Sequence, residues 1–448
     1  MRTFFLATVS AFALLTSACT GDSDRPEATG EGVIRAVNAI STSPDFLFAI
    51  EERLISNVAY SSISDQNIFD DLDYTFNFEV RLPGSLDNQR VASTLLDVER
   101  DHEYTFVISG DIEAPTIIVW DAVRRVFEET ETGFQARFGH TAESVGPIDV
   151  YFAAPGIPPA AGQEVATLSF GEVSQGFDNA AGEYVYILTT AGNPGDILFE
   201  SETLTPGDQS GFIITPFDGT ANVTGDLTVR IISDAGGVSS LADVNTTSTI
   251  RFIHASQALG ISDIYTEDML MDQILANHTY RDVSPDLDLA AGSYTFTYTA
   301  AGNPGSILIE GTGTVVSTAH SQVYAVGEAG ALSSFIRTVD RRPVETLTKF
   351  TFTHAAFNHP AVDLYVVEAG TALEDVLIPE FFNVQPGSFP LTANIDQGDL
   401  ELYLTVAGEK TIIEGPVALT TAFGDVLEYI AYDNVDPATA DLVEIPQP

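Results

Sequence analysis

The sequence of 448 residues predicts an all-β protein, built from four tandem β-sandwich domains of the immunoglobulin-like or transthyretin-like kind that follow a signal peptide. Three observations predict this architecture. The composition favours strands and turns, one hairpin sequence occurs twice, and one opening motif recurs along the chain. Seven or eight short strands per unit of about 100 residues is typical of such a sandwich.

The composition suits a chain with several buried cores. Hydrophobic residues make up 44% of the sequence, which excludes general disorder. The length of 448 residues is too great for one domain of ordinary size. Thr, Val, Ile, Phe and Tyr are plentiful, and 35 Gly and 22 Pro separate the runs that they form. Long stretches of helical periodicity are missing, which leaves β-structure as the expected class.

The repeated hairpin lies at residues 174–200 and again at 284–310, in near copies. In the second copy Tyr294, Phe296 and Tyr298 alternate with threonines, which predicts a strand with one buried and one solvated face. The Ala-Gly-Asn-Pro-Gly that follows has the residues of a tight turn. We therefore interpret the glycines as turn residues and not as a phosphate-binding loop.

A recurring motif stands near the start of each unit. Arg-Phe-Gly-His ends at His140, Arg-Phe-Ile-His ends at His254, and Phe-Thr-Phe-Thr-His ends at His354. An Asp-aliphatic-Tyr triplet begins nine residues after each His, and a divergent first copy has Asn in place of His. The recurring positions are Asn38, His140, His254 and His354, with Asp45, Asp149, Asp263 and Asp363.

This spacing predicts domains at residues 33–130, 131–240, 248–342 and 347–448. A β-propeller is the alternative prediction, but a propeller blade has only four strands and about half the length of these units. We therefore expect separate domains in a semi-rigid row, with the Gly-, Ser- and Asp-rich segment 232–249 as the flexible joint.

The recurring histidines are the first candidates for chemistry, because imidazole can bind metals or act as a general base. His254 and His354 share a strand face with Phe252 and Phe352, which favours a buried side chain that hydrogen-bonds the next turn. Asn38 at the same place supports a structural role, since Asn does not titrate near neutrality. A contact between each His and its following Asp stays open at this point.

The arginines of the opening motif, Arg35, Arg137 and Arg251, point to the opposite strand face. With 18 basic residues against 64 acidic ones, we expect each to pair with a carboxylate on a neighbouring strand. Recognition of an acidic glycan is the alternative.

The N-terminus has the features of an export signal: Arg2, an apolar run from Phe4 to Leu15, and small residues before Cys19. Leu15 to Cys19 resembles the lipobox of bacterial lipoproteins, with Thr16 where Leu is usual. The resemblance implies a signal peptide at 1–18, lipidation of Cys19, a flexible tether at 19–32 and attachment to the outer membrane or cell surface.

The net charge of −46 argues against nucleic acid and anionic lipid as partners. The acidic residues could solvate the surface or bind calcium, although no stretch has the ligand spacing of a calcium-binding hand. Signature motifs of common enzymes are also missing, so we expect no enzyme and no obligatory cofactor.

The Arg-Phe-x-His-Ala-Ser opening of residues 251–256, the Asp-aliphatic-Tyr triplet and the hairpin resemble a bacterial family of exported tandem domains of unknown function. The third unit is the most similar, whereas the fourth has Thr351 in place of Arg. The resemblance implies a fold and a location, and no activity. The function expected is non-enzymatic binding or structure in the cell envelope, with a glycan, matrix or surface-protein partner. The alternatives are a calcium-dependent adhesin and, less favoured, a secreted hydrolase with paired carboxylates.

Overall fold

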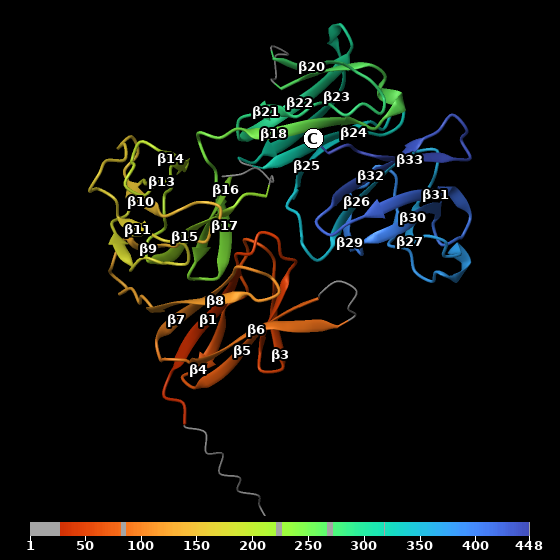
Figure 1. The fold of residues 1–448 in the computed structure, drawn as a ribbon. Helices are drawn as coiled ribbons and strands as arrows, with labels where there is room; N and C mark the ends of the chain where they lie inside the picture. Colours follow the sequence, from red (N-terminus) through yellow and green to blue (C-terminus); the bar gives the residue numbers. More distant parts are fainter. Residues whose placement is uncertain (1–26, 82–86, 221–225, 267–271, 318, 448) are drawn as a thin grey trace, which may run out of the picture.

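The protein folds as eight β-sheets that pair into four sandwiches, which confirms the all-β prediction (Figure 1). This is a computed structural model, and it describes residues 27–81, 87–220, 226–266, 272–317 and 319–447. The signal peptide, Cys19 and most of the tether lie outside these residues. Among the described residues no helix is long and apolar enough to span a membrane.

The first domain pairs the sheet β4-β1-β7-β8 with the sheet β3-β2-β5-β6. Its strands are β1 (Glu31–Asn38), β2 (Phe46–Ile50), β3 (Arg53–Val58), β4 (Asn67–Asp70), β5 (Asp73–Arg81), β6 (Asn88–Asp97), β7 (His102–Ser109) and β8 (Thr116–Val123).

The second domain pairs a five-stranded sheet, β12-β9-β15-β16-β17, with the sheet β11-β10-β13-β14. Its strands are β9 (Phe134–Phe138), β10 (Ile148–Ala153), β11 (Ala166–Leu168), β12 (Phe177–Asn179), β13 (Val185–Thr190), β14 (Ile197–Glu200), β15 (Ser210–Asp218), β16 (Leu227–Ser233) and β17 (Gly237–Leu241).

The third domain pairs β21-β18-β24-β25 with β20-β19-β22-β23. Its elements are β18 (Ser248–His254), the 3-10 turn η1 (Gln257–Leu259), β19 (Ser262–Tyr265), β20 (Gln273–His278), β21 (Leu287–Leu289), β22 (Gly292–Ala300), β23 (Asn303–Val315), β24 (His320–Val326) and β25 (Ser333–Val339).

The fourth domain repeats this order, with the sheets β29-β26-β32-β33 and β28-β27-β30-β31. Its elements are β26 (Thr348–Ala355), β27 (Val362–Glu368), the 3-10 turn η2 (Leu373–Asp375), β28 (Phe381–Val384), β29 (Leu391–Ile395), β30 (Gly398–Val406), β31 (Ile412–Thr421), β32 (Val426–Asp433) and β33 (Ala440–Glu444).

Each domain has its own apolar core between its two sheets. In the first, Phe48, Phe76 and Phe106 pack against one another, with ring centroids 4.9 to 6.0 Å apart. The opening strand of every domain lies parallel to a late strand, β1 beside β7 and β18 beside β24. These opening strands are buried on both faces, because a second layer covers the face that points away from the core.

That second layer is the neighbouring domain. Trp120, Tyr60 and Val37 of the first domain form one buried apolar cluster with Ile213 and Phe217 of the second. A matching cluster joins the third domain to the fourth. The docked pairs therefore differ from the row of separate domains that the sequence suggested (Figure 1).

The two pairs dock with the same contacts. The ring of Tyr60 meets Phe217 edge to face at 6.1 Å, and its hydroxyl donates to the carbonyl oxygen of Asp218 at 2.7 Å. In the other pair Tyr280 meets Tyr432 at 5.5 Å, and its hydroxyl donates to the carbonyl oxygen of Asp433 at 3.3 Å.

The segment 232–249, expected to be a flexible joint, is ordered by pairing. Its residues Gly237–Leu241 form β17, the fifth strand of the sheet, opposite β16. The Asp243 carboxylate accepts the hydroxyl of Thr246 at 2.6 Å, and the Asp243 amide donates to the Ser317 hydroxyl at 2.7 Å. Small polar residues can form exposed edge strands, so part of this segment belongs to the sheet of the second domain.

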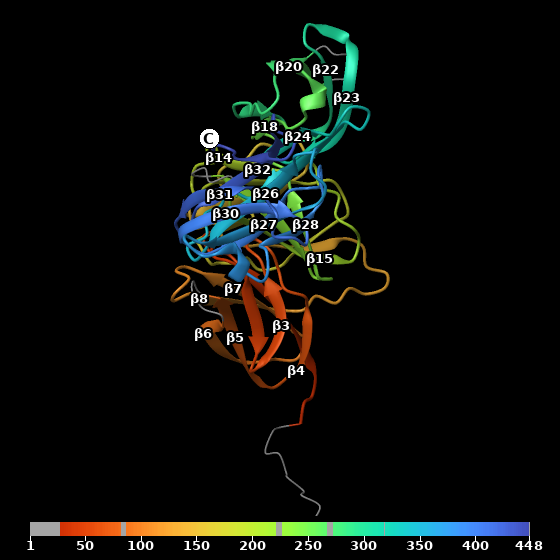
Figure 2. The same ribbon diagram turned by 90° about the vertical axis from the view of Figure 1, so that its right-hand side faces the viewer.

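The segment between the third and fourth domains contacts both the second domain and the first. The Arg341 amide donates to the carbonyl oxygen of Thr220 at 3.0 Å, and the Glu345 amide donates to that of Thr42 at 2.9 Å. The fourth domain is thereby placed beside the first, and the two lie next to each other in both views (Figures 1 and 2).

Candidate functional site

The three recurring histidines are fully buried at the ends of their strands. In each case Nε2 lies on the carbonyl oxygen six residues further along, at 2.9 Å for His140 to Gly146, 2.7 Å for His254 to Gly260 and 2.9 Å for His354 to Pro360. In the first domain the Asn38 amide reaches the carbonyl oxygen of Pro44, also six residues on, at 3.3 Å. The shared position therefore caps the turn that follows the opening strand.

Burial lowers the pKa of His140 and His254 below the usual value and lowers that of His354 to about 4. All three imidazoles are therefore neutral at pH 7, with one nitrogen facing a backbone carbonyl. No group of three or more metal-ligating side chains gathers around them or elsewhere in the described ranges. This arrangement suits a structural element.

The aspartates of the triplet hold the repeated hairpin turn. One carboxylate oxygen accepts the turn glycine's amide, at 2.7 Å for Asp149 to Gly192, 2.8 Å for Asp263 to Gly302 and 2.8 Å for Asp363 to Gly408. The three glycines have φ between 71° and 76°, a left-handed conformation that glycine adopts most easily.

The other carboxylate oxygen of each aspartate accepts from the next strand or loop. Its donor is the Thr167 hydroxyl for Asp149, the Asn277 amide for Asp263 and the Asn383 amide for Asp363. The His and the Asp of one unit therefore bond to separate groups, and no hydrogen bond joins them among the described residues. Asp45 of the first domain accepts from the side-chain amide of the exposed Asn57 at 3.2 Å.

Replacing Asp263 with Ala should lower the free energy of unfolding of the third domain by about 2 kcal/mol, because two backbone amides lose a charged acceptor. Hydrogen exchange of the backbone amides of Gly302 and Asn277, recorded in the full chain at increasing urea concentrations, measures this change in free energy. Asp45→Ala is the matched control, with an expected change below about 0.5 kcal/mol. Equal losses in the two variants would contradict the role of the carboxylate.

The arginines of the opening motif are buried and paired with acids. Arg251 Nε lies 2.7 Å from Asp286, which precedes the strand beside it. Arg137 instead forms an ion pair with Glu103 of the first domain, and Arg35 lies 3.7 Å from Asp234 of the second. Two of the three pairs therefore cross a domain boundary, which spacing along the chain does not reveal.

The fourth domain has Thr351 where the others have Arg, and the charge order is reversed there. Glu428, on the strand beside Thr351, is buried and accepts from residues of the third domain. Arg337 lies 3.2 Å away, the Gln322 amide donates at 2.7 Å, and the Tyr324 hydroxyl donates as well. These ion pairs stabilise docking and are not free to bind an acidic ligand.

A cleft of about 870 Å³ lies between the first and fourth domains. Residues from both domains and from the segment 340–349 line it. A volume of this size lies within the range of small-molecule sites, which commonly occur between domains.

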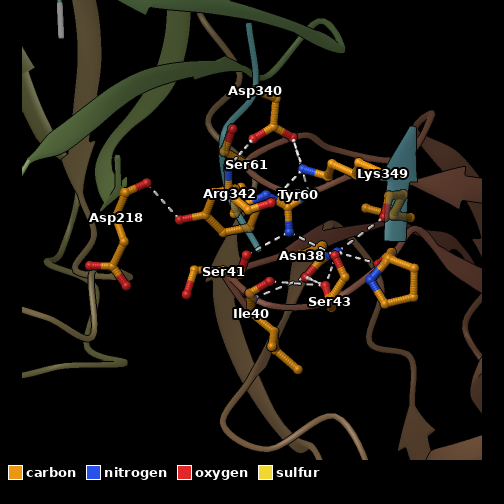
Figure 3. Close-up of polar contacts among 12 residues, drawn as sticks. Asn38, Ile40, Ser41, Ser43, Tyr60, Ser61, Asp218, Asp340, Arg342 and Lys349 are labelled. Atoms are coloured by element: carbon orange, nitrogen blue, oxygen red, sulfur yellow. Dashed lines mark hydrogen bonds and ion pairs between the residues drawn. The ribbon is translucent and has the colours of Figure 1, made fainter. Parts of the chain in front are cut away.

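Arg342 is one of the residues that line the cleft, and Figure 3 shows its polar contacts beside Ser41 and Ser43. One guanidinium nitrogen donates to the carbonyl oxygens of Ser41 and Ser43 at 2.6 and 2.7 Å, and the guanidinium carbon lies 4.6 Å from the centre of the Tyr60 ring. The Asn38 amide donates to the Ser43 hydroxyl at 2.9 Å and so orders the turn that receives Arg342.

Lys349 adds to these polar contacts. Its ammonium donates to Asp340 at 2.6 Å and to the carbonyl oxygen of Arg342 at 2.7 Å, while the Arg342 guanidinium lies 3.5 Å from the same aspartate. Burial lowers the pKa of Lys349, and Asp340 opposes that shift. The sequence interpretation overlooked this cluster, although three cations within nine residues stand out in so acidic a chain.

Fold and contacts together define a protein of four docked β-sandwich domains, with a cleft between the first and the fourth. Residues 248–365 match a family described as "Domain of unknown function (DUF4397)". The match covers the third domain and ends within the second strand of the fourth, so it spans less than half of the chain. It agrees with the resemblance of the third unit to domains of unknown function. No curated protein shows a significant match to the chain.

Two solved structures are similar at a low level. The Bacillus anthracis TIE protein has 10% identity and a TM-score of 0.16, with 91% of this chain and 69% of that chain covered. A CBM26 module from Eubacterium rectale Amy13K, solved with maltoheptaose, has 16% identity and a TM-score of 0.17, with 45% of this chain and 95% of that chain covered. At these TM-scores neither similarity bears on fold or function.

Proposed function

We propose that this protein is a lipid-anchored, non-enzymatic binding protein of the cell envelope. The observation that carries the binding role is the cleft between the first and fourth domains, which unites polar side chains from both. The repeated histidines and aspartates support a role without catalysis, because one ring nitrogen of each His and one carboxylate oxygen of each Asp bond to turn backbone. The partner is a glycan of the envelope or the surrounding matrix.

Amide side chains favour a glycan over an apolar ligand. Asn57, Asn88, Asn394 and Gln397 line the cleft and are exposed. Each amide offers both donors and an acceptor, the combination that sugar hydroxyls require. The acidic surface disfavours anionic polymers as partners by long-range repulsion.

Binding is tested with full-length protein on an array of envelope and matrix glycans. We expect saturable binding to at least one neutral or cationic glycan, and its loss in the variant Asn394→Ala with Gln397→Ala. The same pair of changes at Asn193 and Gln175, exposed in the second domain, serves as the control. Absence of all glycan binding would overturn the binding role and leave a structural one.

The anchor is tested separately by Cys19→Ala. We expect this variant to move from the membrane fraction to the soluble fraction, since a thioether-linked lipid is the proposed attachment. Immunoblots of the two fractions measure the shift, with Ser17→Ala, which leaves the cysteine in place, as the control. Retention of the Cys19→Ala protein in the membrane would contradict lipid anchoring.

A further inference from the structure

The cleft between the first and fourth domains has an excess of negative charge at its open side. Asp45, Glu368, Glu380 and Asp396 line it and are exposed. The lining contains two cations, Arg342 and Lys349, and both are bound to Asp340. Asp45 interacts electrostatically with Lys349, whereas Glu368, Glu380 and Asp396 form no ion pair with either of these two cations.

The carboxylates of Glu380 and Asp396 repel each other. Partial burial and the neighbouring Asp396 raise the pKa of Glu380 above its usual value. A positive group placed between two such carboxylates removes their repulsion and gains charge-assisted hydrogen bonds.

The buried part of the lining also has unused hydrogen-bonding groups. The Thr346 hydroxyl and the Arg342 Nε lack a hydrogen-bond partner in the described chain, and both residues are 7% exposed. Buried polar groups are rarely left without a partner, so a bound molecule or water is expected beside them. Val344 and Ile395, both buried, add apolar surface to the same lining.

From these features, and on the basis of the proposed binding function, we propose that the cleft binds an oligosaccharide that carries free ammonium groups. The ammonium groups pair with Glu380, Asp396 and Asp45, and the amides of Asn57, Asn394 and Gln397 bond the sugar hydroxyls. The apolar residues contact the C–H faces of the rings. No aromatic side chain lines the cleft, so recognition depends on charge and hydrogen bonds.

Calorimetric titration of full-length protein in neutral detergent tests this assignment with three probes. They are a glucosamine tetramer with free amines, its fully N-acetylated counterpart, and spermine, which has charge without hydroxyls. We expect the free-amine tetramer to bind at least tenfold more tightly than either of the others, with affinity that falls as salt is raised.

Variants assign the binding to the cleft. Glu380→Gln, on an exposed side chain that the fold does not need, should weaken binding of the free-amine tetramer about tenfold. Glu183→Gln, an exposed acid of the second domain, makes the same charge change elsewhere and should leave binding unchanged. Equal weakening in both variants would overturn the cleft as the site, and so would no effect of Glu380→Gln.

The other outcomes are equally decisive. Equal affinity for spermine would overturn the sugar component, and equal affinity for the N-acetylated tetramer would overturn the ammonium component. No heat with any probe, together with cleft-dependent binding of another glycan on the array, would overturn this ligand class and leave the proposed function standing. No glycan binding in either experiment would overturn both.

Discussion

Glu428→Ala should destabilise the docked third and fourth domains by about 3–5 kcal/mol. The Glu428 side chain is 3% exposed and faces Arg337, Gln322 and Tyr324 of the third domain. Removing it leaves the guanidinium of Arg337, itself 8% exposed, as a buried charge without its carboxylate. The loss exceeds that of an ordinary hydrogen bond because water cannot take the place of the partner.

The chain provides its own internal reference for this measurement. Its single tryptophan, Trp120, is buried between the first and second domains and donates to the Gly171 carbonyl oxygen at 2.8 Å. In the variant, the midpoint of the urea transition that Trp120 fluorescence reports should therefore be unchanged. Hydrogen exchange of the backbone amides in β24, β25 and β32 should be faster. Glu444→Ala is the matched control, because Glu444 is exposed and accepts a long hydrogen bond, at 3.3 Å, from the Tyr429 hydroxyl. Exchange rates that do not differ between the two variants would refute the buried network.

Acid should unfold the third and fourth domains before the first two. Burial lowers the pKa of His278 and His354 to about 4 and, together with nearby arginines led by Arg341, lowers that of His320 to about 3. The unfolded chain binds these protons near the ordinary pKa of about 6.5. Neutral histidine therefore stabilises the fold above pH 6.5, and this contribution is lost as the pH falls from 6.5 toward 4.

Each such histidine costs about 2 kcal/mol of stability by pH 5, where the unfolded state is protonated and the folded state is not. Urea midpoints between pH 7.5 and 5 measure the effect, in a range where most carboxylates stay ionised. His354→Asn, the exchange that Asn38 shows in the first domain, should flatten the pH dependence. A slope that persists unchanged in this variant would contradict the assignment.

The sequence predicted which face of a strand lies inside a domain better than it predicted how the domains pack against one another. Period two in Phe350, Phe352 and His354 correctly indicates an inward face, because the spacing of strand side chains is a local property. The outward face of β1 carries Arg35 and Val37, and this mixture is compatible with water, an ion pair or another domain. Only the position of residues about 200 places away determines which of these occurs.

The candidate cleft was unpredictable for the same reason. Asp45 and Glu380 are distant in sequence, and Glu380 belongs to no motif that the sequence analysis identified. The segment that brings them near each other depends on Arg342 fitting the turn at Ser41 and Ser43, which in turn depends on Asn38. Sequence spacing identified Asn38 as the divergent repeat position, whereas the structural effect of that divergence needed the fold.

The shared docking contacts of Tyr60 with Phe217 and of Tyr280 with Tyr432 have a consequence for how this chain can change in length. A single sandwich removed from a docked pair would expose the apolar face of its former neighbour to water, whereas a whole pair carries both faces with it. We therefore expect natural relatives to gain or lose domains two at a time, with the junction near residues 242–247. The two-domain pair, and not the single sandwich, is then the unit of inheritance.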